Sequence, residues 1–142
     1  YFQQMAGFEC KPVSVEITYG LERICMFTQQ KKNVYDLNWN NDGIKYHEVF
    51  LQSEIEFSKY NFEYANTENL FKIFNIHEAE ATSLSRNNVS LPAYDQCLKA
   101  SHIFNVLDAR GAISVAERAE FISRIRNIVK LAAEVWIKTQ KV

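Results

Sequence analysis

Three residues with complementary chemistry lie close together in the octapeptide EITYGLER, residues 16–23. Glu16 offers a carboxylate that suits an ammonium group, and Arg23 offers a planar guanidinium that suits a phosphate oxygen. Between them lies Gly20, where the missing Cβ lets a ligand approach the backbone closely. If a strand ends at this glycine and a helix follows, the free amides of the helix start point toward the same place. The octapeptide therefore predicts a site for an anion and an ammonium together.

A plainer interpretation of the same residues stays open at this point. A Glu–Arg pair at a helix start is commonly a solvated surface pair, and a single glycine commonly marks a turn. The octapeptide alone does not separate the two interpretations.

The cysteines and histidines show no metal-binding spacing. The three cysteines lie far apart and outside any CxxC pair, and the three histidines form no HExxH motif; the residues are Cys10, Cys25, Cys97, His47, His77 and His102. Buried reduced thiols are the expected state of the cysteines. We expect no metal site built by the protein itself, so any metal ion would arrive with a ligand.

The composition is that of an ordinary globular protein, with 47% apolar and 23% charged residues in a chain of 142. No apolar run approaches the roughly 18 residues that a membrane span needs. No basic and apolar leader of the secretory kind begins the chain. These features predict a cytoplasmic protein.

Charge is unevenly distributed along the chain. Residues 1–80 contain 7 Lys and Arg against 12 Asp and Glu, whereas residues 81–142 contain 9 against 5. The acidic first part disfavours extensive contact of this chain with nucleic acid. The basic second part suits RNA or an acidic partner protein.

A strand, a glycine turn and a helix are expected to position the site. Residues 13–18 alternate between apolar and polar side chains, which predicts a strand with one buried face and one polar face. A helix is expected after Gly20, up to about residue 30. Residues 31–43 are rich in turn formers, with a short strand expected at 34–37. Because the chain starts abruptly at a strand, we expect further sequence upstream.

The remainder of the chain is expected to be helical. Ser114 and Glu117 have the spacing of a capping box at the start of the last helix. Apolar residues of that helix recur every seven positions, which predicts that they form its buried stripe; they are Val115, Ile122, Val129 and Trp136, with Ile125 and Ala132 between them. The expected helices are 46–64, 67–85, 93–107, with Pro92 at its start, and 115–140.

This order of elements predicts an α+β fold in which the helices are segregated from an antiparallel sheet. We expect the first region to be residues 1–44, with the strands and the octapeptide, and the second to be a helical domain over residues 45–142.

Longer stretches of the chain are similar to one known family. TYGLER resembles motif 3 of class II aminoacyl-tRNA synthetases, a Gly, apolar, Glu, Arg core on a strand-to-helix turn. Further stretches are similar to the alpha subunit of the bacterial heterotetrameric glycyl-tRNA synthetase; they are YFQQ, VYDLNW, VFLQSEIEFSKYNFEYAN, LPAYDQCLKASHIFN and LDARGAISVAER. The resemblance implies that residues 1–44 are the end of a class II antiparallel sheet with motif 3.

The resemblance also implies a reaction. A glycine tRNA ligase uses ATP with Mg²⁺ to make glycyl-adenylate, and then transfers glycine to tRNA-Gly. Arg23 would hold the ATP γ-phosphate, and Gly20 would let the backbone approach the ATP and glycine pocket. Glu16 would receive the glycine ammonium, Thr18 would exclude a larger side chain, and Gln3 would line the same pocket. Glu22 would orient Arg23 or its neighbours.

The resemblance implies partners as well. These are a beta subunit that carries most tRNA recognition, and a second alpha subunit in a homodimer. Motifs 1 and 2 are not found in this chain, which we therefore expect to be inactive by itself. Two alternatives remain: a non-catalytic assembly or regulatory module with a synthetase-like scaffold, and an alanine-activating relative.

Overall fold

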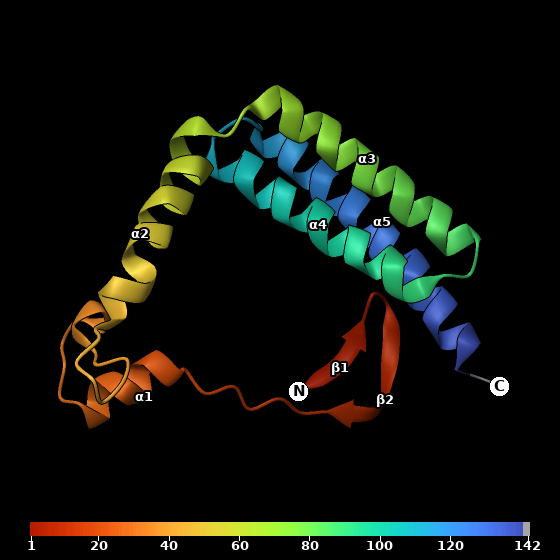
Figure 1. Ribbon diagram of the computed structural model, residues 1–142. Helices are drawn as coiled ribbons and strands as arrows, with labels where there is room; N and C mark the ends of the chain where they lie inside the picture. Colours follow the sequence, from red (N-terminus) through yellow and green to blue (C-terminus); the bar gives the residue numbers. More distant parts are fainter. Residues whose placement is uncertain (141–142) are drawn as a thin grey trace.

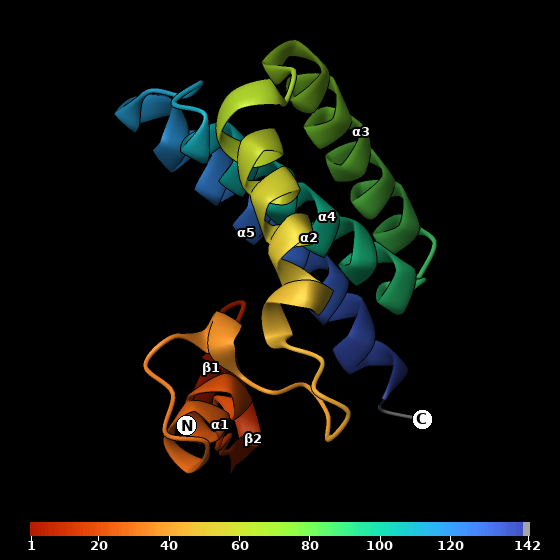
Figure 2. The same cartoon turned by 60° about the vertical axis from the view of Figure 1, so that its left-hand side comes forward.

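The computed structural model describes residues 1–140 and has the shape of an arch (Figure 1). An antiparallel hairpin stands at the amino end, and a bundle of three helices forms one limb. Helix α2 (Tyr46–Lys59) forms the other limb and leads up to the bundle, and the hairpin lies beneath the bundle; Figure 2 shows α2 from another side. The predicted α+β class is confirmed.

The hairpin consists of β1 (Phe2–Met5) and β2 (Phe8–Ser14), with Met5 opposite Phe8 and Phe2 opposite Ser14. Its two turn residues both have positive φ angles, 50° at Ala6 and 86° at Gly7. This is the twist that a tight hairpin turn needs, and glycine adopts it without a Cβ penalty.

The strand predicted at residues 13–18 is wrong over most of its length. β2 ends at Ser14, and residues 15–20 have no regular structure. β2 pairs with β1, and Phe2, the first residue of β1, lies opposite Ser14. No described strand therefore lies beside residues 15–18 to extend the pairing. The apolar alternation is present, but its side chains are exposed instead of buried. The exposed side chains are Val13, Val15, Ile17 and Tyr19.

Helix α1 (Leu21–Thr28) begins directly after Gly20, as predicted. The short strand predicted at 34–37 is wrong, because the chain forms the 3-10 helix η1 (Val34–Asp36) there. Asn33 explains the difference: its side-chain oxygen accepts the Tyr35 N–H at 3.0 Å and starts the turn.

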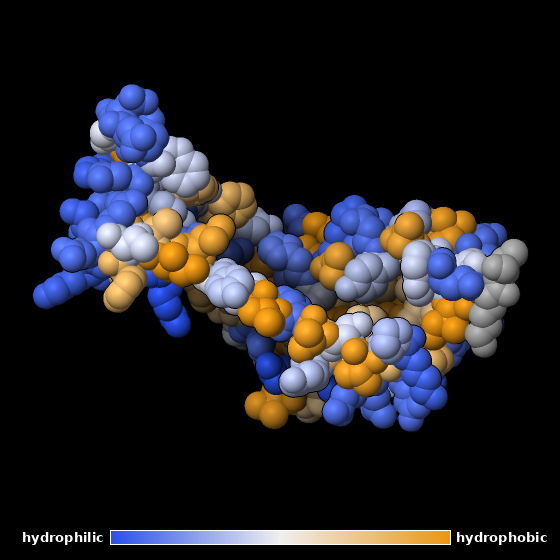
Figure 3. Space-filling view, turned by 90° about the horizontal axis from the view of Figure 1, so that it is seen from below, coloured by the Kyte–Doolittle hydropathy of each residue, from blue (hydrophilic) through white to orange (hydrophobic). Residues whose placement is uncertain are grey.

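The helix expected at 46–64 is present in two parts. Helix α2 is followed without a break by η2 (Tyr60–Tyr64), a short π-helix. Neither part contains a buried residue. Figure 3, which views the molecule from below, shows hydrophobic side chains interspersed with hydrophilic ones on the surface.

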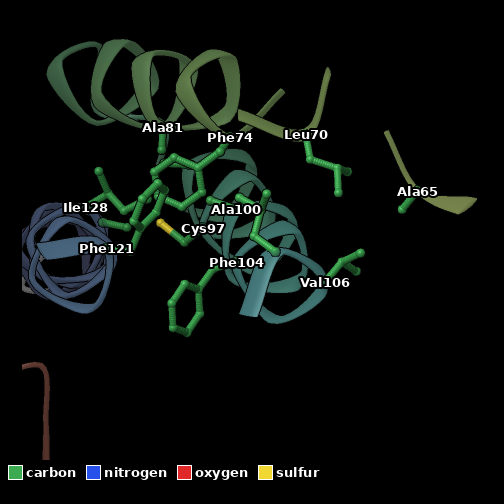
Figure 4. Packing of buried hydrophobic residues seen from close by; sticks show 13 residues of the cluster. Ala65, Leu70, Phe74, Ala81, Cys97, Ala100, Phe104, Val106, Phe121 and Ile128 are labelled. Carbon is green, nitrogen blue, oxygen red and sulfur yellow. The ribbon is translucent and has the colours of Figure 1, made fainter. Parts of the chain in front are cut away.

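The core lies in the bundle of α3 (Thr67–Arg86), α4 (Ser90–Ala109) and α5 (Val115–Thr139). Phe74 of α3 and Phe121 of α5 meet edge to face with ring centroids 4.6 Å apart. Figure 4 shows them pointing toward one another above Cys97 of α4. Burial raises the pKa of the Cys97 thiol to about 11, so this cysteine is an uncharged core residue at neutral pH.

The buried stripe of α5 lies one residue away from the predicted one. Phe121, Ile128 and Val135 are buried, and Phe121 is 6% exposed. The predicted stripe is correct only in part: Ala132 is buried and Ile122 and Val129 pack against the core. Its two ends are exposed, Val115 to 89% and Trp136 to 44%. The predicted row therefore lies on the flank of the buried face, where it faces an open groove.

The predicted capping box at the start of α5 is confirmed. Ser114 Oγ accepts the Glu117 N–H at 3.3 Å, and a Glu117 carboxylate oxygen accepts the Ser114 N–H at 2.7 Å. The Ser114 backbone and then its hydroxyl hold the pKa of Glu117 below its usual value. Because this pKa is lowered in the folded state, the stabilisation is complete above the ordinary glutamate pKa. It is lost as the pH falls through the lowered value.

We expect Ser114→Ala to lower the free energy of unfolding by about 0.5–2 kcal/mol, because the Glu117 N–H loses its acceptor, the Ser114 hydroxyl. Urea unfolding followed by circular dichroism measures this. The control is Ser123→Ala, an exposed position within the same helix, which should leave stability equal or slightly higher. Equal stability of the Ser114→Ala variant and the wild type would show that the box contributes nothing.

Candidate active site

The carboxylate of the candidate site is held by a neighbour two residues away. Thr18 Oγ1 donates a hydrogen bond to Glu16 Oε1, so the two side chains lie on the same side of the exposed segment 15–20. This contact occupies one oxygen of the carboxylate and leaves Glu16 Oε2 available. A carboxylate held in this way can receive an ammonium group.

The turn before α1 is made by Gly20 in an extended conformation, with φ −78° and ψ 98°. Any L-residue can adopt these angles. A Cβ added at Gly20 would meet the Cβ of Arg23 at 3.8 Å, which is an ordinary contact. The backbone itself therefore does not require glycine here. Room for a ligand is the remaining physical reason for it, and that role stays a prediction.

Arg23 occupies the first turn of α1 and is exposed. Within residues 1–140 its guanidinium forms no hydrogen bond or ion pair. An arginine with all five donors free near a helix start is suited to bind phosphate oxygens. Its neighbour Glu22 contacts another residue: Tyr46 donates its hydroxyl to Glu22 Oε1 at 3.4 Å.

Gln3 lies apart from these residues on β1. It lines a shallow concavity of about 410 Å³ on the hairpin, together with residues 9–13. The structure thus brings Glu16 to Thr18 and Gly20 to Arg23 within one short segment. The concavity that Gln3 lines on the hairpin does not include any of these four residues.

Sequence reasoning missed an aromatic concavity beside α1. This concavity of about 410 Å³ is lined by Leu21, Glu22, Cys25, Leu37, Asn38, Trp39, Tyr46 and Phe50. The Trp39 and Phe50 rings meet edge to face at 5.2 Å, and Tyr46 and Phe50 at 4.8 Å. Burial and then Glu22 raise the pKa of Tyr46 above its ordinary value, so its hydroxyl stays a donor at neutral pH. The density of aromatic residues around position 40 is the feature of the sequence that could have predicted this concavity.

Other polar residues that could do chemistry have structural contacts. Arg110 donates to the Phe62 carbonyl at 2.6 Å, and Asp108 pairs with Arg118 at 3.1 Å. His77 contacts Gln96 Oε1 at 2.7 Å. Within residues 1–140 there is no group of three or more His, Cys, Asp or Glu that could hold a metal ion. No helix in the same part of the chain is long and apolar enough to cross a membrane.

Comparison with known protein families places the chain among the aminoacyl-tRNA synthetases, which are ligases of protein biosynthesis. The matching family model is described as glycyl-tRNA synthetase alpha subunit. It covers residues 1–141, so the chain belongs to that family. The name of an alpha subunit implies that a beta subunit is present in the same complex.

Proposed function

We propose that this chain contributes motif 3 to a class II centre that activates glycine with ATP and transfers it to tRNA-Gly. The family match over residues 1–141 supports the proposal. The observation that carries it is the presence, within eight residues, of a guanidinium at Arg23 that makes no ion pair among residues 1–140 and a carboxylate at Glu16 that Thr18 holds. A non-catalytic assembly module would not need both groups beside a helix start.

Arg23 acts by positioning and charge. Its guanidinium holds the ATP γ-phosphate while the glycine carboxylate attacks the α-phosphate, and it stabilises the departing pyrophosphate. Mg²⁺ arrives with ATP as part of the substrate complex and neutralises phosphate charge. Gly20 leaves space for the nucleotide beside the helix start, where the free amides favour an anion.

Glu16 binds the other substrate. Glycine offers an ammonium and a carboxylate but no side chain, so a carboxylate that receives the ammonium is the contact available to recognise it. Rejection of alanine must be steric, because no pocket can hold an absent methyl group. Thr18, which is held against Glu16, is the wall we propose. Gln3 is a further candidate for the same pocket.

We expect Glu16→Gln to raise the KM for glycine by about 10- to 100-fold, since a hydrogen bond to a charged group is replaced by a neutral one. The KM for ATP should change much less. Steady-state ATP–pyrophosphate exchange with each substrate varied in turn measures both. Glu9→Gln, an exposed carboxylate of the hairpin that pairs with Lys11, is the matched control and should leave both KM values unchanged. An unchanged glycine KM in Glu16→Gln would remove Glu16 from the ammonium site.

The proposal places motifs 1 and 2 outside this chain and expects residues 1–142 alone to be inactive. In the cytoplasmic complex that we propose, two alpha subunits form a homodimer, and the beta subunit makes most contacts with tRNA-Gly. The division into a catalytic region over residues 1–44 and a helical domain over residues 45–142 is part of the same proposal. It agrees with a core cluster that lies wholly between Ala65 and Ala132.

Glycine-dependent ATP–pyrophosphate exchange by an alpha subunit that includes motifs 1 and 2 tests the proposal. Exchange with glycine, and little with alanine, supports it. Faster exchange with alanine would identify an alanine-activating relative instead. Absence of exchange with either amino acid would favour a non-catalytic assembly module.

A further inference from the structure

An apolar groove runs between α4 and α5 on the side of the bundle that faces the hairpin. It has a volume of about 230 Å³ and is lined almost wholly by apolar side chains; the lining residues are Met5, Ser90, Leu91, Tyr94, Val129, Ala132, Ala133 and Trp136. The tip of the hairpin points toward the bundle in Figure 1, and Met5 beside this tip lines the groove. Met5 at this tip is itself more than half exposed, so the hairpin does not fill the groove.

The walls of the groove are unusually exposed for large apolar residues. Leu91 is 64% exposed and Trp136 is 44% exposed. On α4 the row continues at Leu98, which is also exposed, so Leu91, Tyr94 and Leu98 form a stripe along one side of the helix. Concave apolar surface that a chain leaves uncovered is typical of a site where another molecule docks.

The rim of the groove is positively charged. Arg126 and Lys130, one turn apart on α5, line a second concavity that shares Val129 with the first. Within residues 1–140 neither cation forms an ion pair. The charges on the α4 side, Asp95 and Lys99, neutralise each other at 2.7 Å. The surface therefore offers an apolar floor beside two free cations, which is complementary to an apolar and acidic partner.

We propose that this groove, defined by Leu91, Tyr94, Val129 and Trp136 with Arg126 and Lys130 on its rim, docks the beta subunit. The occupant is a segment of the beta subunit that inserts a bulky apolar side chain between α4 and α5 and places carboxylates against the two cations. This inference rests on the proposed membership of the chain in an alpha–beta complex. RNA fits less well, because the floor is apolar and two cations neutralise little of a phosphate backbone.

Sedimentation velocity and titration of the alpha subunit that contains this chain with the beta subunit test the proposal. Leu91→Asp and Trp136→Ala should each weaken the complex by about 30-fold or more, as expected for a central apolar anchor. Lys130→Glu should slow association and reduce the dependence of the affinity on salt. The matched controls are Ile76→Asp and Lys72→Glu on α3, where Ile76 is 64% exposed and Lys72 is also exposed; both should bind normally.

Each outcome decides the proposal. Wild-type affinity of both Leu91→Asp and Trp136→Ala, with thermal melts like that of the wild type, would overturn it. The proposal would also be overturned if the variants bind the beta subunit normally but lose another interaction. Loss of self-association would mean that a second alpha subunit occupies the groove, and loss of tRNA-Gly binding would mean that RNA does. Complex formation is measured without glycine or ATP, so failure of the glycine exchange assay leaves this result unchanged.

Discussion

In an alpha subunit that includes motifs 1 and 2, replacement of Arg23 by alanine is expected to lower glycine-dependent ATP–pyrophosphate exchange by about 10²- to 10³-fold, the cost of removing one preorganised charge donor. The structure makes this substitution a clean test. Arg23 is exposed and forms no ion pair among residues 1–140. Its removal should therefore change the free energy of unfolding by no more than about 0.5 kcal/mol. Loss of exchange with a normal melting temperature would locate the defect in substrate binding or chemistry.

Two further variants sharpen the assignment of Arg23. Arg23→Lys keeps the positive charge but loses the planar fork, so we expect an activity between those of the wild type and Arg23→Ala. Arg86→Ala removes an exposed arginine at the end of α3 and should leave exchange unchanged. If Arg23 binds the γ-phosphate, the KM for ATP should rise more than the KM for glycine. Normal exchange in Arg23→Ala would remove the role of this residue altogether.

The local part of the candidate site could be predicted from the sequence, whereas its surroundings could not. The start of α1 after Gly20 and the position of Arg23 in its first turn follow from neighbouring residues. The strand end predicted at Gly20 was wrong, because β2 ends at Ser14. The Glu16–Thr18 contact follows from the alternation of side chains in an extended chain. Whether residues 13–18 form a strand depends instead on a partner for the ladder, and that partner is not a local property. The 3-10 helix at 34–36 depended on a single Asn33 side chain that caps it.

The helices show a second limit of sequence reasoning. Their positions could be predicted, because caps and turns are local: the Ser114–Glu117 box marks the start of α5 as expected, and Pro92 falls in the first turn of α4. The buried face of α5 could not be predicted in this way. Two adjacent rows of α5 are apolar every seven residues, one through Phe121 and one through Ile122. The choice between them is made by Phe74 and Phe104, which come from other helices and contact the Phe121 ring.

The same aromatic contact gives the largest stability effect that we expect. Phe74→Ala should lower the free energy of unfolding by about 3–5 kcal/mol, the range for removing a buried aromatic ring. Phe74 is fully buried, and its ring meets Phe121 at 4.6 Å. The Arg124 guanidinium also lies 4.7 Å from the ring centroid of Phe74. The substitution thus leaves a cavity and removes an aromatic pair and a cation–π contact together.

Urea unfolding of the bundle, followed by circular dichroism, measures this effect. Phe57→Ala on α2 is the matched control, because it removes the same ring from a position that is 65% exposed; it should change stability by about 0.5 kcal/mol or less. A small effect at Phe74 would mean that α3 and α5 repack without it. Arg124 also pairs with Glu78 at 2.5 Å across the same two helices. That ion pair would then be the contact holding α3 against α5, and Glu78→Gln would become the more damaging change.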